Sequence, residues 1–566
     1  RSFINLFVGL TMTAAFGLMM VGALNLISVY FAVLFVGIGV DFGIQYSVRY
    51  RADRHELNDL EGAVRAAGRK FGAPLTLAAG ATAAGFMSFL PTPYKGVSEL
   101  GLIAGFGMLF AFATSVTLLP ALIRVLNPPG GAEPPGFPSL APVDEFMERR
   151  RIPILIGTLA LVVGGLPLLY WLHFDFNPVN LRSPQTESIA TYLELAKDPS
   201  TNPSTIGVLA PSLKDADAMV PKLQKVPEVA RVLTLSSFIP ENQKEKMPLI
   251  QGAAKELVPA FDPKNALPPP SDQDNIEALN EGAERLTQAA SKENGAGANA
   301  AKRLAENLKK LAAAPQAMRD KATEAFIPPL KSMLQVLQAS LNPQDVTLQT
   351  LPESLKRDWV TQDGHARVEI SPKDDPSSNE LMRKFARAVL AAEPTAIEGP
   401  ISILEAGDTI VKAFIEAGAW ALLSIGLLLW IVLRRFTDVL MTVVPLLLAG
   451  VVTLEACVLI GLPLNFANII ALPLLLGVGV AFKIYYIMAW RAGQTNLLQT
   501  SLTHAVIFSA LTTATAFGSL WFSSHPGTSS MGKLLALSLL CTLAAAVLFQ
   551  PLLMGKPRKT ADVERT

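Results

Sequence analysis

The stretch GIGVDFGIQY, residues 37–46, places a single carboxylate, Asp41, inside a long apolar region. The run LISVYFAVLFV precedes this stretch, and the arginines of SVRYR follow it closely. Apolar runs of this length predict a transmembrane helix. A charged side chain at the centre of a bilayer costs about 2.5–3.5 kcal/mol on insertion scales and usually marks a functional position. The other interpretation is an aspartate that only hydrogen-bonds a neighbouring helix.

The composition is that of a membrane protein and contains no enzyme signature. Of the 566 residues, 50% are hydrophobic and 17% are charged, whereas soluble domains carry roughly 25% charge. The net charge of +1 gives no electrostatic reason to expect nucleic-acid binding. The sequence has no phosphate-binding loop and no metal-ligand spacing of His, Cys and carboxylates. We therefore expect no catalytic residues, no metal and no cofactor.

Ten apolar segments are predicted to cross the membrane. They are Phe3–Leu24, Val29–Tyr50, Phe71–Leu90, Leu100–Val125, Ile152–Leu172, Val411–Leu433, Val439–Leu459, Phe466–Trp490, Ala505–Phe522 and Leu534–Leu553. Lys and Arg gather in alternate loops, such as RYRADRH, ERRR and the tail GKPRKT, and the positive-inside rule places these loops in the cytoplasm. The segment His55–Lys70 has an apolar face at helical spacing and is predicted to be an amphipathic helix on the cytoplasmic surface.

Residues 173–410 are polar and follow a different pattern. STIGVLAP and ARVEIS are predicted strands, and DADAMVPKLQKV and SNELMRKFARAVLAAEP are predicted helices that follow such strands, as in α/β units. Between them, residues of about 272–341 have the pattern of long antiparallel helices, with a turn at ENGAGANAA. This region is predicted to lie on the non-cytoplasmic side, as a solvated insertion or as a substrate conduit.

An internal repeat relates the two apolar parts of the chain. Residues 24–51 align without gaps with residues 464–491, at an offset of 440, and GATAAGF then faces LTTATAF at an offset of 431. Parallel duplication of membrane helices is typical of transporters. The repeat predicts a complete protein with twelve spans and two outer domains, of which this chain carries ten and one. We therefore expect an N-terminally truncated chain.

The repeat, the topology and the GIGVD motif resemble the resistance–nodulation–division (RND) superfamily of transporters. FDFNPVNLRSPQTESIATYLELAKDP and GVGVAFKIYY resemble, more closely, the hopanoid-biosynthesis-associated RND transporters, relatives of the mycobacterial membrane protein large (MMPL) lipid exporters. The resemblance implies an α-helical polytopic membrane protein with duplicated RND transmembrane halves and an α/β periplasmic domain with a long helical insertion. It also implies a bacterial inner-membrane protein that uses protons to move hopanoid lipids toward the outer membrane, with a homodimer favoured.

The same resemblance divides the chain into segments. They are transmembrane helices 3–6 of the first repeat (1–126), a cytoplasmic linker (127–151), transmembrane helix 7 (152–172), the periplasmic domain (173–410), transmembrane helices 8–12 (411–555) and a cytoplasmic tail (556–566).

The resemblance implies that Asp41 stands at the proton-relay position of the RND superfamily. The repeat places Ala481 opposite Asp41, so the candidate cation is Lys483, two residues further on. Two residues are about 200° apart on a helix, so Lys483 either pairs with Asp41 or points away and reaches the cytoplasmic surface. Otherwise the relay depends on hydroxyl groups. The predicted relay residues are Asp41, Lys483, Thr512 and Thr513, with Gln45 and Thr82 as possible neighbours.

Three other functions remain open at this point: an exporter of another lipid or a drug, a lipid receptor similar to sterol-sensing proteins, and an accessory motor for protein secretion. Asp41 argues against a purely passive receptor. A possible substrate path, or alternatively a helix-packing core, is the apolar face formed by Leu330, Met333, Leu334 and Leu337.

Overall fold

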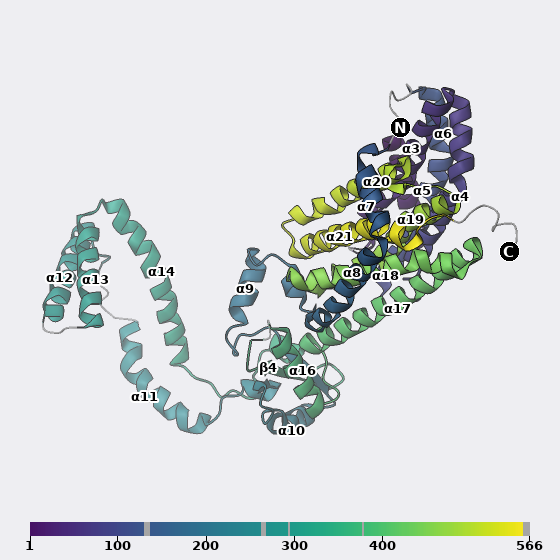
Figure 1. Ribbon diagram of the computed structural model, residues 1–566. Helices are drawn as coiled ribbons and strands as arrows, with labels where there is room; N and C mark the ends of the chain where they lie inside the picture. The colour runs from purple at the N-terminus through teal and green to yellow at the C-terminus, as the bar shows by residue number, and fades with distance from the viewer. Residues whose placement is uncertain (26, 129–135, 262–267, 292–294, 376–377, 558–566) are drawn as a thin grey trace. The chain divides into compact units, whose positions relative to one another are not determined.

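The computed structural model describes residues 1–25, 27–128, 136–261, 268–291, 295–375 and 378–557 (Figure 1). Most of the predicted tail and part of the predicted ENGAGANAA turn lie outside the described residues. The chain separates into two compact units. The first unit comprises Arg1–Val208, Pro221–Val232 and Glu369–Thr566, and the second comprises Leu209–Val220 and Leu233–Val368.

The first unit contains the helices of both repeats. The first repeat forms α1 (Ser2–Val21), α2 (Phe31–Leu34), α3 (Val40–Leu57), α4 (Leu60–Met87), α5 (Lys95–Val116) and α6 (Leu118–Leu126). The chain continues through α7 (Ala141–Arg149) and α8 (Arg151–Gly165). The second repeat forms α17 (Gly399–Leu433), α18 (Phe436–Leu459), α19 (Ala471–Arg491), α20 (Ser501–Ser519), α21 (Pro526–Ala544) and α22 (Gln550–Met554). Two π-helical turns interrupt these helices, η2 (Phe35–Gly39) before α3 and η9 (Ala545–Phe549) before α22.

Nine helical segments in the described part of the chain are long and apolar enough to cross a membrane. They match nine of the ten predicted spans. The remaining prediction, Phe71–Leu90, falls mostly in α4, which is rich in the weakly hydrophobic residues Ala, Gly and Thr. Helix α4 packs against α3, α5 and α19. Its small side chains allow these helices to approach closely, which explains why its sequence is less hydrophobic than that of the other spans.

The predicted surface helix His55–Lys70 is wrong as a separate element. The chain turns at Asn58, which has a left-handed φ of 46°, and α4 then runs unbroken from Leu60 to Met87. Ala63 and Ala67, on the predicted apolar face, are fully buried in a small core of the first unit. The part of the face formed by these two alanines is therefore covered by protein, whereas Leu57, on the same predicted face, is 51% exposed.

The predicted span Leu100–Val125 is divided into α5 and α6 at Thr117. Pro120 explains the break, since proline has no N–H to donate and its ring clashes with the carbonyl four residues earlier.

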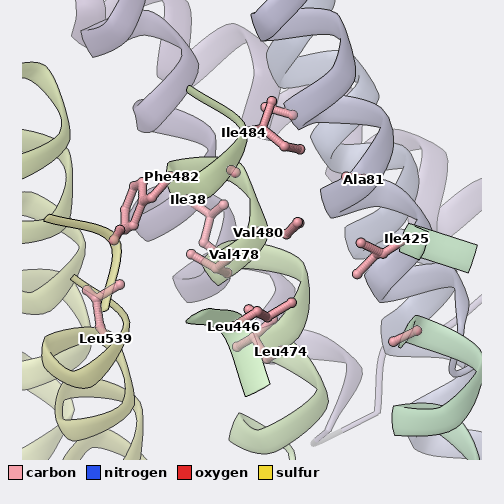
Figure 2. Close-up of a cluster of buried hydrophobic side chains, with 14 of the residues drawn as sticks. Ile38, Ala81, Ile425, Leu446, Leu474, Val478, Val480, Phe482, Ile484 and Leu539 are labelled. Atoms are coloured by element: carbon pink, nitrogen blue, oxygen red, sulfur yellow. The ribbon is translucent and has the colours of Figure 1, made fainter. Parts of the chain in front are cut away.

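Helix α19 lies at the centre of the hydrophobic core of the first unit. Figure 2 shows Phe482 on the side of α19 that faces Leu539, and Val480 on the side toward Ala81 and Ile425. All five side chains are at most 4% exposed. The core therefore joins helices of the first repeat, such as α4, to helices of the second.

The polar region between the repeats contains short strands and further helices. Strand β1 (Phe174–Asp175) pairs in parallel with β5 (Leu464–Asn465), with Phe174 opposite Leu464. A second sheet has the order β2–β4–β3, formed by Ile206–Ala210, Ala366–Pro372 and Val229–Leu233. The helices of this region are α9 (Glu187–Leu195), α10 (Leu213–Leu223), α11 (Gln243–Phe261), α12 (Asp272–Ser291), α13 (Ala296–Ala313), α14 (Gln316–Ser340), α15 (Glu353–Trp359) and α16 (Asn379–Ala392).

Helices α12 and α13 of the second unit pack side by side (Figure 1). Arg319, at the start of α14, joins this helix to both of them. Its Nε lies 2.6 Å from Oδ1 of Asp272 on α12, and another guanidinium nitrogen donates to the carbonyl of Ala312 on α13. The hydrogen bond from Arg319 lowers the pKa of the Asp272 carboxyl below its usual value. Side-chain hydrogen bonds of Arg319 therefore connect the three long helices α12, α13 and α14.

Candidate functional site between the two repeats

Asp41 lies in the first turn of α3, directly after the π-helical turn η2, and is only 4% exposed. Its carboxylate accepts hydrogen bonds from three side chains. Gln45 Nε2 donates to Oδ1 at 3.2 Å, Tyr485 Oη donates to Oδ2 at 3.3 Å, and Ser509 Oγ donates to Oδ1. Tyr485 belongs to α19 and Ser509 to α20, so the carboxylate connects the two repeats.

The turn before Asp41 is also bound to α20. The hydroxyl of Thr513 donates to the carbonyl of Gly37, within η2, at 2.5 Å. A π-helical turn leaves backbone groups without their usual α-helical partners, and such turns often occur at functional sites. Ser509 and Thr513 are one turn apart on α20, as Gly37 and Asp41 are on the first-repeat segment. Two adjacent hydrogen bonds therefore join these two segments.

The repeats therefore cross where η2 and α3 meet α20, and an equivalent contact occurs at a second crossing, where α4 meets α19. Thr82 on α4 donates to the carbonyl of Gly477 on α19 at 3.0 Å. Thr82 and Thr513 correspond at the offset of 431, and Gly37 and Gly477 correspond at 440. A Cβ on Gly85 would lie 2.7 Å from Gly477 Cα, which explains why glycine is needed at this crossing. The predicted correspondence of Thr82 with Thr513 thus has a structural counterpart.

The structure does not bring Lys483 to Asp41. Among the ion pairs of the described residues, none contains either side chain. Lys483 Nζ instead donates to the carbonyl of Thr542 on α21 at 3.2 Å. The side chain is fully buried, so the predicted reach to the cytoplasmic surface is wrong as well. The 200° separation on α19 turns Lys483 toward its own repeat, and a carbonyl near the π-helical turn η9 gives the amine an internal acceptor.

The remaining predicted residues divide into two groups. Gln45 contacts Asp41 directly, whereas the hydroxyl of Thr512 donates to the carbonyl of Ser509 within its own helix at 2.8 Å. The predicted face on α14 is 37–60% exposed, so it forms neither a buried core nor a closed path among the described residues; its members are Leu330, Met333, Leu334 and Leu337.

Two contacts of Asp41 were not predicted from the sequence, namely Tyr485 and Ser509. The repeat contained a signal for the first, because Tyr485 is the counterpart of Gln45 at the offset of 440. Helical spacing contained a signal for the second, because Ser509 lies one turn before the predicted Thr513.

Comparison with known proteins identifies the family. Residues 3–135 and 252–556, more than half of the chain, match the MMPL family. The chain belongs to the MMPL family. This match confirms the resemblance on which the sequence interpretation relied.

The chain is also similar to two curated transporters along almost its whole length. It is 61% identical over 554 residues to the hopanoid transporter HpnN of Rhodopseudomonas palustris (strain TIE-1) and 58% identical over 559 residues to that of Burkholderia multivorans. Each alignment covers 98% of this chain and 64% of the relative. The chain therefore spans slightly less than two thirds of the length of these relatives.

Among solved structures, the fold is similar to that of SecDF in its super-membrane-facing form. The TM-score is 0.50 with 12% identity, and the alignment covers 97% of this chain and 58% of that one. At this identity the likeness concerns the fold alone. It supports a multi-pass helical membrane architecture.

Proposed function

We propose that this chain is part of a proton-driven transporter that moves hopanoid lipids from the inner membrane toward the outer membrane. The observation that supports the cargo is the 61% and 58% identity to two hopanoid transporters over 98% of the chain. The relatives are longer, so the proposal concerns the complete protein to which this chain belongs.

The surroundings of Asp41 support proton coupling. An ionised carboxylate only accepts hydrogen bonds, whereas a protonated one also carries an O–H donor. The bonds from Tyr485 and Ser509 suit the ionised form. Protonation removes the charge that strengthens these bonds and adds an O–H that needs an acceptor, which favours reversal of one of the two contacts. Each contact joins α3 to a helix of the other repeat. Gain and loss of a proton would therefore change how the repeats pack, which is the type of switch that alternating access requires.

The proposed orientation places the Lys- and Arg-rich loops in the cytoplasm and residues 173–410 in the periplasm. The exposed apolar face of α14 is a candidate contact for lipid in that compartment, since soluble surfaces rarely expose contiguous apolar side chains without a partner. Protons are the proposed coupling ion, and a homodimer is the proposed assembly. Asp41 favours this function over a passive lipid receptor, which needs no titratable group at the interface of the repeats.

The test uses the full-length protein in a hopanoid-producing strain that lacks the native gene. Wild type and Asp41→Asn are expressed at equal levels, and hopanoids are quantified in separated inner and outer membranes. Asn retains the size of Asp but cannot exchange a proton, so we expect outer-membrane hopanoids to fall by at least about 100-fold, within the range that positioned proton-transfer groups contribute.

Thr512→Val is the matched control, because its hydroxyl bonds only a carbonyl of its own helix. We expect this variant to restore hopanoid distribution as wild type does. Equal restoration by Asp41→Asn would disprove proton coupling at this residue. No redistribution by wild type would disprove the hopanoid cargo.

A further inference from the structure

A cavity of about 510 Å³ lies against two hydrogen-bond donors of Asp41, between α3 and α4 of the first repeat and α19 and α20 of the second. Its lining includes Gln45 and Tyr485, the two residues that donate to Asp41 besides Ser509. Its lining also includes Arg49, Lys70 and Gln494, which lie toward the basic loops. Gln494 is exposed and the Lys70 side chain is 49% exposed, so this end of the cavity reaches the surface.

The cavity suits water better than an anion. Its two cations, Arg49 and Lys70, are both paired with the buried carboxylate of Asp53, at 3.0 Å and 2.8 Å. They are therefore already neutralised in part. A buried water takes about 30 Å³ and needs two to four polar partners, so the volume admits on the order of ten waters. Thr500 and Ser501 add hydroxyl groups to the wall.

The inner end of the cavity contains an unfilled hydrogen-bonding position. Gln45 uses its amide nitrogen on Asp41, while its amide oxygen is buried and has no partner among the described residues. A buried amide oxygen without a donor is costly, and a water in the cavity would provide that donor. Phe71 stacks on Tyr485 with ring centroids 5.4 Å apart and holds the phenol at the same end.

We propose that this cavity is a water-filled vestibule through which Asp41 exchanges its proton with the compartment on the Lys- and Arg-rich side of the membrane. The inference rests on the proposed proton coupling and adds its route and its side. In the releasing step the O–H bond of the Asp41 carboxyl breaks and its proton passes to the hydroxyl oxygen of Tyr485, which gives its own proton to a vestibule water. The phenol is thereby restored, and the hydronium ion leaves past Arg49 and Lys70. The carboxylate that remains is held by its hydrogen bonds. The ionisable residues that line the route are Arg49, Lys70 and Tyr485.

The first test measures access to the vestibule by thiol labelling. In the full-length protein every native cysteine, including Cys457 and Cys541, is replaced by Ala. A single cysteine is then introduced by Ala489→Cys, in the lining of the cavity, or by Ile487→Cys, which is fully buried on the same helix and outside the cavity. A membrane-impermeant cationic methanethiosulfonate reagent is added to inside-out and right-side-out vesicles. Since thiol reactivity follows exposure, we expect Ala489→Cys to react at least about tenfold faster than Ile487→Cys, and only from the basic side.

The second test asks whether the vestibule carries the proton. Proton flux is followed with a pH-sensitive dye in vesicles before and after labelling. Labelling at Ala489→Cys should block the flux, and labelling at Arg65→Cys, an exposed position outside the cavity on α4, should not.

Failure of Ala489→Cys to react, or full proton flux after it has reacted, would overturn the vestibule. The labelling readout does not depend on the cargo. Loss of transport in Asp41→Asn together with an unreactive Ala489→Cys would therefore preserve the proposed function and reject this route.

Discussion

The two crossings between the repeats have the same backbone contact. At one, Thr513 of the second repeat donates to the carbonyl of Gly37 in the first, and at the other, Thr82 of the first repeat donates to the carbonyl of Gly477 in the second. Both threonine side chains are fully buried. Duplication has therefore preserved a hydrogen bond across the interface in both directions.

The crossings differ one helical turn away. Beside the Thr513 contact, Asp41 accepts from Ser509. The repeat places Ala481 and Ala78 at the corresponding positions of the other crossing, and both alanines are buried. A symmetric scaffold thus carries one charged position and one apolar position. The cost of a buried carboxylate therefore arises at one crossing and not at the other. Under the proposed proton coupling, protonation would act directly on the crossing that contains Asp41.

Among variants that make the two crossings more alike, Ser509→Ala should reduce transfer most. It gives α20 the side chain that α4 has at the corresponding position, Ala78. The substitution removes a donor to Asp41 while the Thr513 contact remains. We expect hopanoid transfer to the outer membrane to fall about tenfold, which corresponds to about 1.4 kcal/mol and is the scale of a hydrogen bond to a charged group. Ser509→Thr retains the hydroxyl and should recover most of the transfer.

Full transfer by Ser509→Ala would contradict a role for the hydroxyl, and failure of Ser509→Thr at normal expression would indicate a packing effect instead. The variants are compared at equal protein levels, with hopanoids measured in the separated membranes.

Much of this interface could be predicted from the sequence, because its pattern is repeated. The offset of 431 related Thr82 to Thr513, and the lone charge in an apolar run marked Asp41. The hydrogen-bond partners of Asp41 were harder to predict, since serine and tyrosine are common in membrane helices and only the crossing of helices brings Ser509 and Tyr485 to one carboxylate. The prediction of a separate surface helix at His55–Lys70 was wrong for a related reason, because Ala63 and Ala67 suit packing as well as a surface position.

A smaller and more selective effect is expected from the matched pair Thr513→Val and Thr82→Val. Each removes one hydrogen bond between the repeats at nearly constant volume, worth about 1 kcal/mol. Both should lower the thermal unfolding midpoint of the purified full-length protein equally, by no more than about 2–4 °C, the shift that 1 kcal/mol produces in domains of 150–250 residues. Only Thr513→Val should reduce transfer, because its bond to Gly37 adjoins Asp41.

The two threonines serve as controls for each other, since they share burial, geometry and position in the repeat. Equal loss of transfer in both would mean that the crossings act together and that the charge does not distinguish them. Loss of transfer in Thr82→Val alone would mean that transport depends on the crossing of α4 with α19 and not on the crossing that contains Asp41.

Lys483 neither pairs with Asp41 nor reaches the surface, the two positions that the sequence suggested for it. Its counterpart in the first repeat is Gly43, and a Cβ there would lie 3.8 Å from Ser115 Oγ and Asn5 Nδ2, within the first repeat. The same helical angle directs Lys483 into the second repeat, where it contacts Thr542. Helical geometry alone could exclude the Asp41 side, but it could not identify a backbone carbonyl as the acceptor.

The smallest effect is therefore expected from Lys483→Met. Met has a similar length and no charge, so the substitution loses the bond to the Thr542 carbonyl but also removes the cost of burying an amine; replacing buried charges by apolar groups of similar volume is often neutral. We expect hopanoid transfer within about twofold of wild type, since both repeat crossings remain intact. Lys483→Ala instead leaves a cavity and should destabilise the protein by about 2–5 kcal/mol, as large-to-small core substitutions do.

If Lys483→Met abolished transfer as Asp41→Asn does, while its unfolding midpoint stayed normal, the amine would have to reach Asp41 in another conformation. The interface would then work as an ion pair that opens and closes, and the asymmetry between the crossings would depend on two residues and not on Asp41 alone.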